Sequence, residues 1–487
     1  MNLLRFLIVP LAVSLFAIFP LTDTDIWWHL ACAREWVTTW TPVRTPILNV
    51  HEYFQQVVGF VYALGGAPLL VAFKALLWGG VFALFLFPLR RTSLDWRAVA
   101  FAVVVLFLLR FQFEIRPVVF SMLFLGIFWN LLPRLFDFPK RNAVLVAVLL
   151  LCLQWLWCRF QGLYVLGPLV TGVCILFWFF AQGRNAGHRA KLFYAGFWLL
   201  LCAMPLLHED GLALFFYPFG LLDRLLGLSK SAAVFASGIA ENRSLLALVA
   251  LRENLVASAV ASVLAMASII LCVRRFVAAV RRRAWPDWHA TSAHAVLAAT
   301  AFLALVAERN VALFLPVFAC FVLGSAWGCA PVCRACRFCR YVPAAAIFLV
   351  LGFWCRSLMP YDATMVARSR VPVAAAQWMK AHPHAGRLFN DDRAGGYLAF
   401  VNPGDSIYLD GRFILKTAEF FSRYLGYAGN PDAFMHDMDS LGVDRALFPL
   451  RYYARWDAVV DALSRSGRWT LEYVDNDFVV FDRNSLR

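Results

Sequence analysis

Long apolar segments recur along most of this 487-residue chain, and they constrain its fold more than any other feature. A helix needs about 17–25 mostly apolar residues to cross a bilayer. Segments that meet or approach this length lie at 3–21, 67–89, 97–113, 117–136, 142–158, 162–181, 192–207, 255–273, 290–307, 310–328 and 341–358. Because 62% of the residues are hydrophobic and 15% are charged, a water-soluble core cannot cover this apolar surface. We therefore predict a mainly α-helical, polytopic membrane bundle with about eleven spanning helices.

The basic residues between these segments indicate how the bundle is oriented. With a cytoplasmic N-terminus, nearly every basic cluster falls inside, for example at 90–91 and 281–283, whereas the outside segments are mixed or acidic. This positive-inside bias predicts a multi-pass protein of the plasma (inner) membrane, in contact with membrane lipids. It accounts for the net charge of +15 without nucleic acid as a partner. Residues 3–21 could instead be a cleaved signal peptide, but no small-x-small cleavage site follows, so a retained first span is preferred.

Residues 359–487, called the tail below, are rich in Asp and Arg and contain no spanning segment. Strand-like pieces at 386–389, 397–401, 406–409, 445–448, 470–474 and 478–481 alternate with helical pieces at 371–382, 418–427 and 457–466. This alternation predicts a small α/β domain on the extracytoplasmic side, periplasmic or extracellular. The predicted division is a helix bundle at 1–358 and a soluble domain at 359–487. Residues 391–397 and 410–412 are expected to form turns, with a substrate contact as the alternative.

The most informative polar residues follow the first apolar segment on its outer side. Asp23 and Asp25 are one residue apart, so they could share a divalent cation (Mg²⁺ or Mn²⁺), or one could act as a base. The alternative is that they only mark a helix end in water. His29 shares a face with Asp25 if this stretch is helical, which makes it a candidate substrate contact. The aromatic-rich segment 26–40 is expected to form an amphipathic helix in the membrane interface.

Two further charged pairs, Glu114 with Arg116 and Glu308 with Arg309, also fall at the outer ends of predicted spanning helices. They are therefore expected at the same depth as Asp25. Carboxylates combined with arginine suit a phosphate-bearing substrate, because guanidinium binds phosphate through two parallel hydrogen bonds. The alternative for each pair is a local salt bridge.

A cysteine cluster lies on the predicted cytoplasmic side, with the spacing C-x3-C-x2-C-x2-C. Such a spacing is compact enough for zinc or an iron–sulfur cluster. Arginines interleave with the cysteines and no second ligand pair follows, which favours unliganded thiols. The cluster consists of Cys329, Cys333, Cys336 and Cys339.

Several short motifs together resemble the type-C glycosyltransferase superfamily, whose members use polyprenyl-phosphate-linked sugars. They are Asp-x-Asp-x-Trp-Trp-His-Leu at 23–30, Arg116-Pro117 with Ser121, the segment from Trp157 to Gly162, Glu308-Arg309-Asn310, Gly-Gly-Tyr-Leu at 395–398, and Asp410-Gly411-Arg412. Gln161 stands where histidine is usual, and 206–211 departs from an Asn-Pro-x-Gly pattern. The motifs are spread over most of the chain, but each of them is short.

The resemblance implies transfer of a sugar from a polyprenyl phosphate to an acceptor on the extracytoplasmic face; the acceptor itself stays unknown. Asp25 or Asp23 would deprotonate the acceptor hydroxyl, and Arg116 or Arg309 would stabilise the departing phosphate, with or without a divalent cation. The segment 26–40 would help to shape a lipid entrance.

Two other function classes compete with sugar transfer. A transporter or flippase would carry a polar or lipid-linked solute, but such proteins usually place ionisable residues near the membrane midplane, whereas the acids here collect at the outer ends. A non-catalytic assembly factor would need far fewer helices.

Overall fold

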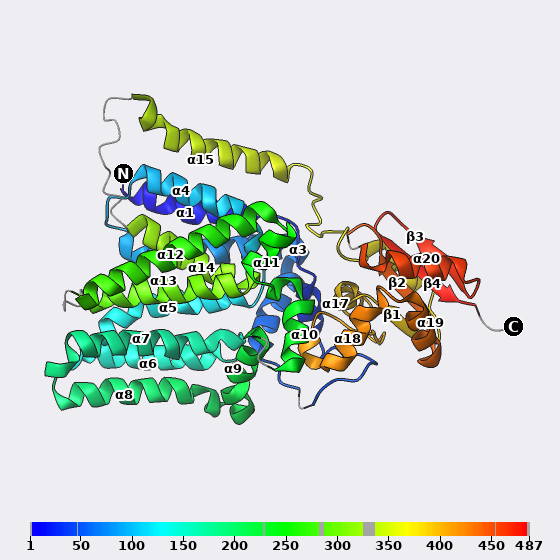
Figure 1. The fold of residues 1–487 in the computed structure, drawn as a ribbon, viewed down its shortest axis with the longest axis horizontal. Coiled ribbons are helices and arrows are strands. Elements are labelled where there is room, and N and C mark those ends of the chain that lie inside the picture. The colour runs from blue at the N-terminus through cyan, green and yellow to red at the C-terminus, as the bar shows by residue number, and fades with distance from the viewer. Residues whose placement is uncertain are drawn as a thin grey trace.

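In the computed structural model, residues 2–45, 47–226, 229–281, 287–324, 337–452 and 454–484 are described. Figure 1 shows long helices running side by side along the longest axis of the molecule, with the tail at one end of them and the N-terminus at the other. The chain is therefore a helix bundle that carries a mixed α/β unit at one end, as the sequence predicted.

The bundle helices coincide with the apolar segments of the sequence. Their bounds are α1 (Asn2–Phe16), α3 (Glu52–Leu86), α4 (Trp96–Leu108), α5 (Val118–Leu135), α6 (Arg141–Trp157), α7 (Leu166–Ala181), α8 (His188–Ala203), α12 (Leu255–Arg281), α13 (Trp288–Val306), α14 (Val311–Gly324) and α15 (Arg337–Leu358). Among the described residues, seven helices are long and apolar enough to cross a membrane, and others, such as α1, α4 and α6, are shorter. The count of about eleven spans therefore stays a prediction.

Helix α3 is interrupted at Gly65 and Gly66, whose backbone angles are not helical. Gly66 has a φ of 64°, which glycine adopts without the steric cost that other residues meet. The interruption explains why the sequence predicted a span from 67 onward. It leaves the first part of α3 as a separate helical piece at the tail end.

The outer segment after α1 forms helix α2 (Asp25–Cys32), and its position corrects the expectation of an interfacial helix at 26–40. Six consecutive residues of α2, from Ile26 to Ala31, are buried. Helix α2 packs against α3 and against α17 (Asp392–Val401) of the tail. Its aromatic side chains therefore pack against other helices of the protein. An amphipathic sequence pattern alone cannot show whether the apolar face of a helix contacts protein or lipid.

The second long outer segment contains α9 (Gly211–Leu226), α10 (Lys230–Gly238) and α11 (Leu245–Leu251). Helix α9 exposes Leu212, Phe216, Phe219 and Leu222 at 71%, 61%, 64% and 48%. Residues spaced this way lie on one face of a helix, which is typical of a helix at a membrane interface. Among the described helices, α9 therefore fits the expected amphipathic pattern better than α2, which is buried.

Short 3₁₀ turns close many of the connections in the bundle. They are η1 (Phe87–Leu89), η2 (Arg110–Gln112), η3 (Gly162–Val165), η4 (Gly183–Asn185), η5 (Met204–Leu207), η6 (Ala240–Asn242) and η7 (Glu308–Asn310). The cysteines 329, 333 and 336 lie outside the described residues, as does the side chain of Cys339, so the expectation for that cluster stays a prediction.

The tail contains a four-stranded sheet in the order β1-β2-β4-β3. The strands are β1 (Arg387–Asn390), β2 (Val443–Pro449), β3 (Trp469–Val474) and β4 (Phe478–Arg483), with β1 and β2 parallel and the other pairs antiparallel. The remaining elements are α16 (Val373–Ala381), α17, η8 (Phe413–Leu415), α18 (Ala418–Tyr427), α19 (Pro431–Ser440), η9 (Ala454–Trp456) and α20 (Asp457–Arg465). Four of the predicted strands and all three predicted helices are confirmed.

Two predicted strands of the tail are wrong. Residues 397–401 belong to helix α17, and 406–409 form a loop with one bridge, from Thr39 to Ile407. The supposed turn at 391–397 is a helix start, because the Asp391 side chain accepts a hydrogen bond from Arg393 N at 3.0 Å and caps α17. The turn was predicted because Gly395 and Gly396 are typical of turns, but both glycines lie within α17. A methyl group on Gly395 would lie 1.9 Å from the Leu409 carbonyl oxygen, so glycine is needed there for packing.

The bundle and the tail are joined by the outer loop between α2 and α3. Trp40 Nε1 donates to Leu388 O at 2.9 Å, and the Thr41 hydroxyl donates to Tyr408 O. Lys416 Nζ donates to Thr39 Oγ1 at 2.8 Å and to Thr41 Oγ1 at 2.6 Å. One hydrophobic cluster runs from the bundle into α16, α17 and β4. The tail is therefore held against the bundle by a buried interface.

Candidate functional site

The acidic loop after α1 is held at the end of the bundle that faces the tail. Asp23 is buried, with 6% of its surface exposed, and Asp25 is half-buried as the first residue of α2. Asp23 Oδ1 accepts a hydrogen bond from Asp25 N at 3.2 Å. A carboxylate at a helix N-terminus is stabilised by the unpaired backbone N–H groups and the helix dipole. The two carboxylates therefore lie at the end of the bundle that contacts the tail, and the expectation that this end is extracytoplasmic stays a prediction.

Arg116 lies between two carboxylates from distant parts of the chain. Its Nε and Nη2 donate to Asp23 Oδ2 and Oδ1 at 2.7 and 3.0 Å. Its Nη1 and Nη2 donate to Glu241 Oε2 and Oε1 at 2.5 Å each. Both contacts are bidentate, which is the strongest geometry for an arginine–carboxylate pair. Arg116 does not pair with Glu114 among the described residues, so the local salt bridge weighed from sequence is absent there.

Glu114 instead faces Lys74, a side chain of α3 with no exposed surface. Lys74 Nζ lies 3.8 Å from Glu114 Oε2 and donates to the Phe19 carbonyl oxygen at 3.1 Å. The Thr22 hydroxyl donates to Glu114 Oε1. Burial raises the pKa of Glu114. This buried pair ties the end of α1 to α3 and supports the Asp23 loop from the membrane side.

Asp25 differs from Asp23 because its carboxylate forms no ion pair among the described residues, although the Trp28 side chain and the charge of Arg116 lie close enough to act on it. Burial, followed by the nearby Asp23 carboxylate, raises the pKa of Asp25 to about 8. Gly411 of the tail lies directly against it, since a methyl group on Gly411 would be 2.0 Å from Asp25 Oδ1. A carboxyl group that ionises near neutral pH is suited to accept a proton from a substrate.

The Glu308–Arg309 pair occupies η7, between α13 and α14. No salt bridge joins the two residues, and neither has an ion-pair partner among the described residues. Burial, together with the charge of Glu241, raises the pKa of Glu308. Burial opposes ionisation of Glu241, but the charges of Arg116, Arg309 and Arg393 lower the pKa of Glu241 overall. Arg309 is therefore near the Arg116 cluster and has donors available for a ligand.

His29 shares a short helix with Asp25, as predicted, but its side chain is only 3% exposed. Its ring lies 4.8 Å from the Phe54 ring and 5.4 Å from the His51 ring, centroid to centroid. Burial lowers the pKa of His29 well below its usual range, so the ring is neutral. The ring packs in an aromatic cluster, and the predicted substrate contact of His29 stays a prediction.

A divalent cation between Asp23 and Asp25 does not fit these positions. Both oxygens of Asp23 are occupied by Arg116, whose charge repels a metal ion. Among the described residues, no group of three or more His, Cys, Asp or Glu side chains could hold a metal. Magnesium and manganese need several oxygen ligands, which this site does not supply.

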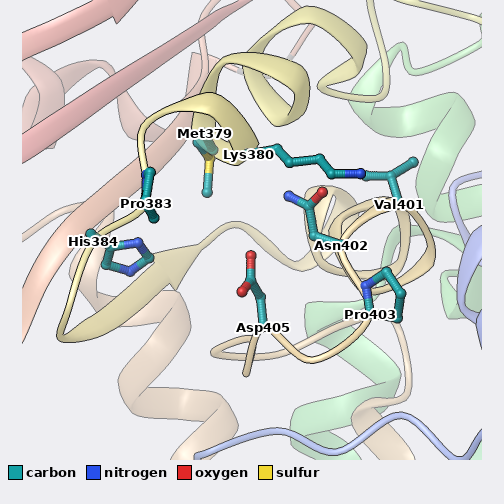
Figure 2. A pocket seen from close by; sticks show the side chains of 8 residues that line it. All are labelled: Met379, Lys380, Pro383, His384, Val401, Asn402, Pro403 and Asp405. Atoms are coloured by element: carbon teal, nitrogen blue, oxygen red, sulfur yellow. The ribbon is translucent and has the colours of Figure 1, made fainter.

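Two cavities are described near these elements, and Asp23 and Asp25 line neither of them. One, of about 150 Å³, lies between α2 and α3 and includes Arg34, Tyr62 and Phe400. The other, of about 300 Å³, lies in the tail between α16 and the end of α17. Figure 2 shows His384, Asp405 and Asn402 around this second cavity. The acidic pair is instead surrounded by charged side chains from several segments.

Two residues of this cluster were not predicted as site residues. They are Glu241, in η6, and Lys74, inside α3. A buried lysine in a spanning helix needs a partner, so Lys74 itself was a signal that an outer acid would lie next to it. Nothing local to Glu241 indicated Arg116 as its partner, because the two residues are 125 positions apart.

No protein-family model and no curated protein matches the sequence. Among solved structures, the Archaeoglobus fulgidus oligosaccharyltransferase in its apo form aligns over 93% of this chain and 71% of its own, with a TM-score of 0.56 and 12% identity. The A. fulgidus oligosaccharyltransferase AglB in complex with an inhibitory peptide and a dolichol-phosphate aligns over 91% and 69%, with a TM-score of 0.54 and 11% identity.

The chain has the type-C glycosyltransferase fold. The resemblance inferred from the short motifs is thus confirmed at the level of the fold. A third structure of the A. fulgidus enzyme contains Zn and sulfate and aligns over 91% of this chain and 67% of its own, with a TM-score of 0.51 and 13% identity. At 11–13% identity, these matches establish the fold of the chain but not its reaction. The chemistry has to be inferred from the residues of the site.

Proposed function

We propose that this protein transfers a sugar from a polyprenyl-phosphate-linked donor to an acceptor on the extracytoplasmic face of the plasma membrane. The observation that carries the proposal is Asp25, a carboxyl group at the tail end of the bundle that lies near the Asp23–Arg116 pair and forms no ion pair of its own among the described residues. The shared fold with an enzyme whose structure holds dolichol-phosphate and a peptide supports a lipid-linked donor.

In the proposed reaction, the acceptor hydroxyl oxygen forms a bond to the anomeric carbon of the sugar. The bond from that carbon to the phosphate oxygen breaks, and polyprenyl phosphate leaves with the electron pair. Asp25 takes the proton of the hydroxyl, a contribution of about 10²–10⁴ in rate for a positioned base. Arg309 stabilises the charge that develops on the leaving phosphate.

Arg116, Asp23 and Glu241 have a supporting role in this scheme. Asp23 is engaged by Arg116 at 2.7 and 3.0 Å, so its charge is balanced and it is not available as a base. The Asp23–Arg116 contact holds the backbone of the Asp23–Asp25 loop in place. The carboxylates of Asp23 and Glu241 raise the pKa of Asp25, and the charge of Arg116 opposes them. No step is assigned to a metal ion, because the arrangement does not supply its ligands.

The test uses purified full-length protein in detergent with a panel of synthetic polyprenyl-phosphate sugars and measures the release of polyprenyl phosphate. Asp25→Asn should abolish release, whereas the matched control Asp432→Asn, at an exposed position of the tail, should retain it. Arg309→Gln should reduce release strongly, with Arg91→Gln as its exposed control.

The same preparation decides between the enzyme and the transporter. If no donor on the panel is cleaved and a polar or lipid-linked solute accumulates in proteoliposomes, the transfer proposal is wrong. Release that is equal in Asp25→Asn and the unaltered protein would remove Asp25 from the mechanism.

A further inference from the structure

An aromatic side chain of the tail, Tyr452, is contacted by two arginines at once. The guanidinium carbon of Arg370 lies 4.3 Å from the centroid of the Tyr452 ring, and that of Arg393 lies 5.1 Å from it. Arg370 precedes α16, Arg393 is in the first turn of α17, and Tyr452 follows β2. Three separate segments of the tail therefore bring two positive charges onto one ring.

This group lies beside the acidic loop of the bundle. Arg370 Nη1 donates to the Thr22 carbonyl oxygen at 3.2 Å, one residue before Asp23. Arg393 is one helical turn from Gly396, where an added methyl group would lie 3.5 Å from the Thr24 carbonyl oxygen. The charge of Arg393 also contributes to the lowered pKa of Glu241. Both arginines are thus at the tail side of the proposed reaction centre, where Figure 1 shows α17 on the side of the tail that faces the bundle.

The state of Arg370 differs from that of Arg116. Arg116 makes bidentate contacts with two carboxylates, whereas Arg370 has no ion-pair partner among the described residues. Tyr452 is 36% exposed and both arginines are half-buried, so a solute can reach them. A guanidinium group that stacks on an aromatic ring keeps its in-plane N–H donors directed outward, which is the geometry that binds carboxylate or phosphate.

We propose that Arg370, Tyr452 and Arg393 form a binding site for an oxyanion, a phosphate or carboxylate group of the substrate, on the tail side of the loop that holds Thr22 and Asp23. The ring fixes the orientation of both guanidinium groups. This inference rests on the proposed function for the role of the anion, but anion binding itself does not require that the protein transfers sugar.

The first experiment measures binding without turnover. Inorganic pyrophosphate is titrated into the full-length protein in detergent and binding is followed by calorimetry. Arg370→Gln and Arg393→Gln should each weaken binding at least about tenfold, the loss of one charge-assisted contact. Arg387→Gln is the matched control, because Arg387 is also an arginine of the tail that stacks on an aromatic ring, at 5.0 Å from the Trp40 centroid, and donates to a carbonyl oxygen.

A second variant separates orientation from charge. Tyr452→Leu keeps both arginines and should also weaken pyrophosphate binding. Arg370→Lys should bind more tightly than Arg370→Gln but less tightly than the unaltered protein, because lysine keeps the positive charge and lacks the paired N–H donors of a guanidinium group. Unchanged melting temperatures exclude unfolding as the cause. Absence of pyrophosphate binding by the unaltered protein, or equal binding by the control and the two arginine variants, overturns the inference.

The source of the anion is identified with turnover assays. If it is the donor phosphate, Arg370→Gln raises the KM for the lipid-linked sugar; if it is an acidic group of the acceptor, only the KM for acidic acceptors rises. Retained pyrophosphate binding in a protein that transfers no sugar would refute the proposed function and leave the anion site standing.

Discussion

At the scale of single residues, Asp23 and Asp25 show how neighbouring carboxyl groups acquire different properties. Asp23 accepts two hydrogen bonds from Arg116, while Asp25 is packed against Gly411 and forms no ion pair among the described residues. The spacing of the two residues in the sequence cannot reveal this difference. It depends on Arg116, which is contributed by the segment before α5.

The pH dependence of activity should report on Asp25. Because its pKa is raised to about 8, the proton-accepting form is scarce at lower pH. We expect kcat/KM to rise about tenfold per pH unit up to that value and then to level off. The measurement is the pH profile of polyprenyl phosphate release. A profile that is flat between pH 5 and about 8 would contradict a base with this pKa.

The same shift has a consequence for stability. The folded chain holds the Asp25 proton more tightly than an unfolded chain with a carboxyl pKa of 3.8. Stability should therefore fall as the pH rises from about 4 to about 8. Asp25→Asn should flatten this part of the curve of melting temperature against pH, and Asp432→Asn should not.

Arg116→Gln should impair both folding and activity. It leaves Asp23, with a side chain 4% exposed, without its positive partner. We expect a loss of stability of about 3 kcal/mol, at the low end for a buried pair because Arg116 and Glu241 are partly exposed. Denaturant unfolding measures this, and Arg91→Gln is the control. Removal of Glu241 as well should recover part of the loss, whereas a double variant as unstable as the sum of its single changes would show that Glu241 and Arg116 act independently.

Removal of divalent cations should leave activity unchanged. Both oxygens of Asp23 are engaged by Arg116, so the cation predicted from the sequence has no ligand set here. The check is release of polyprenyl phosphate after chelation with EDTA. Loss of activity that Mg²⁺ or Mn²⁺ restores would show that substrate or rearrangement completes a metal site.

At the scale of elements, the contact of α2 with α17 and the loop at 410–412 determines where Asp25 points. Gly411→Ala would place a methyl group 2.0 Å from Asp25 Oδ1, so we expect the carboxylate to be displaced and activity to be lost while the fold is retained. Gly426→Ala in α18 is the matched control, because an added methyl group there meets nothing within 4 Å. Circular dichroism and turnover on both variants measure the outcome. Full activity of Gly411→Ala would mean that Asp25 need not stay against this loop.

At the scale of the whole molecule, the proposal requires the tail to lie outside the cell. A reporter enzyme that is active only outside the cytoplasm should be active when fused after residue 484 and inactive when fused in the basic segment at 90–97. The opposite result would reverse the orientation and place Asp25 away from an extracytoplasmic acceptor.

The sequence by itself determined the helical bundle, because long apolar segments have few stable alternatives outside a bilayer. It also determined the position of the acidic loop and most strands of the tail, since each depends on residues close together in the chain. Helix α17 was missed because its two glycines serve packing against Leu409 and Trp28, which are not local.

Only the tertiary structure decided which charges meet. Arg116 contacts Asp23 and Glu241, 93 and 125 positions away, and Arg370 reaches Thr22 across 348 positions. Ion pairs form between whichever groups the packing of apolar helices brings together, and that packing is set by shape and burial over the whole chain. For this reason residue types and spacing could name Asp25, Arg116 and Arg309 but could not assign a partner to each.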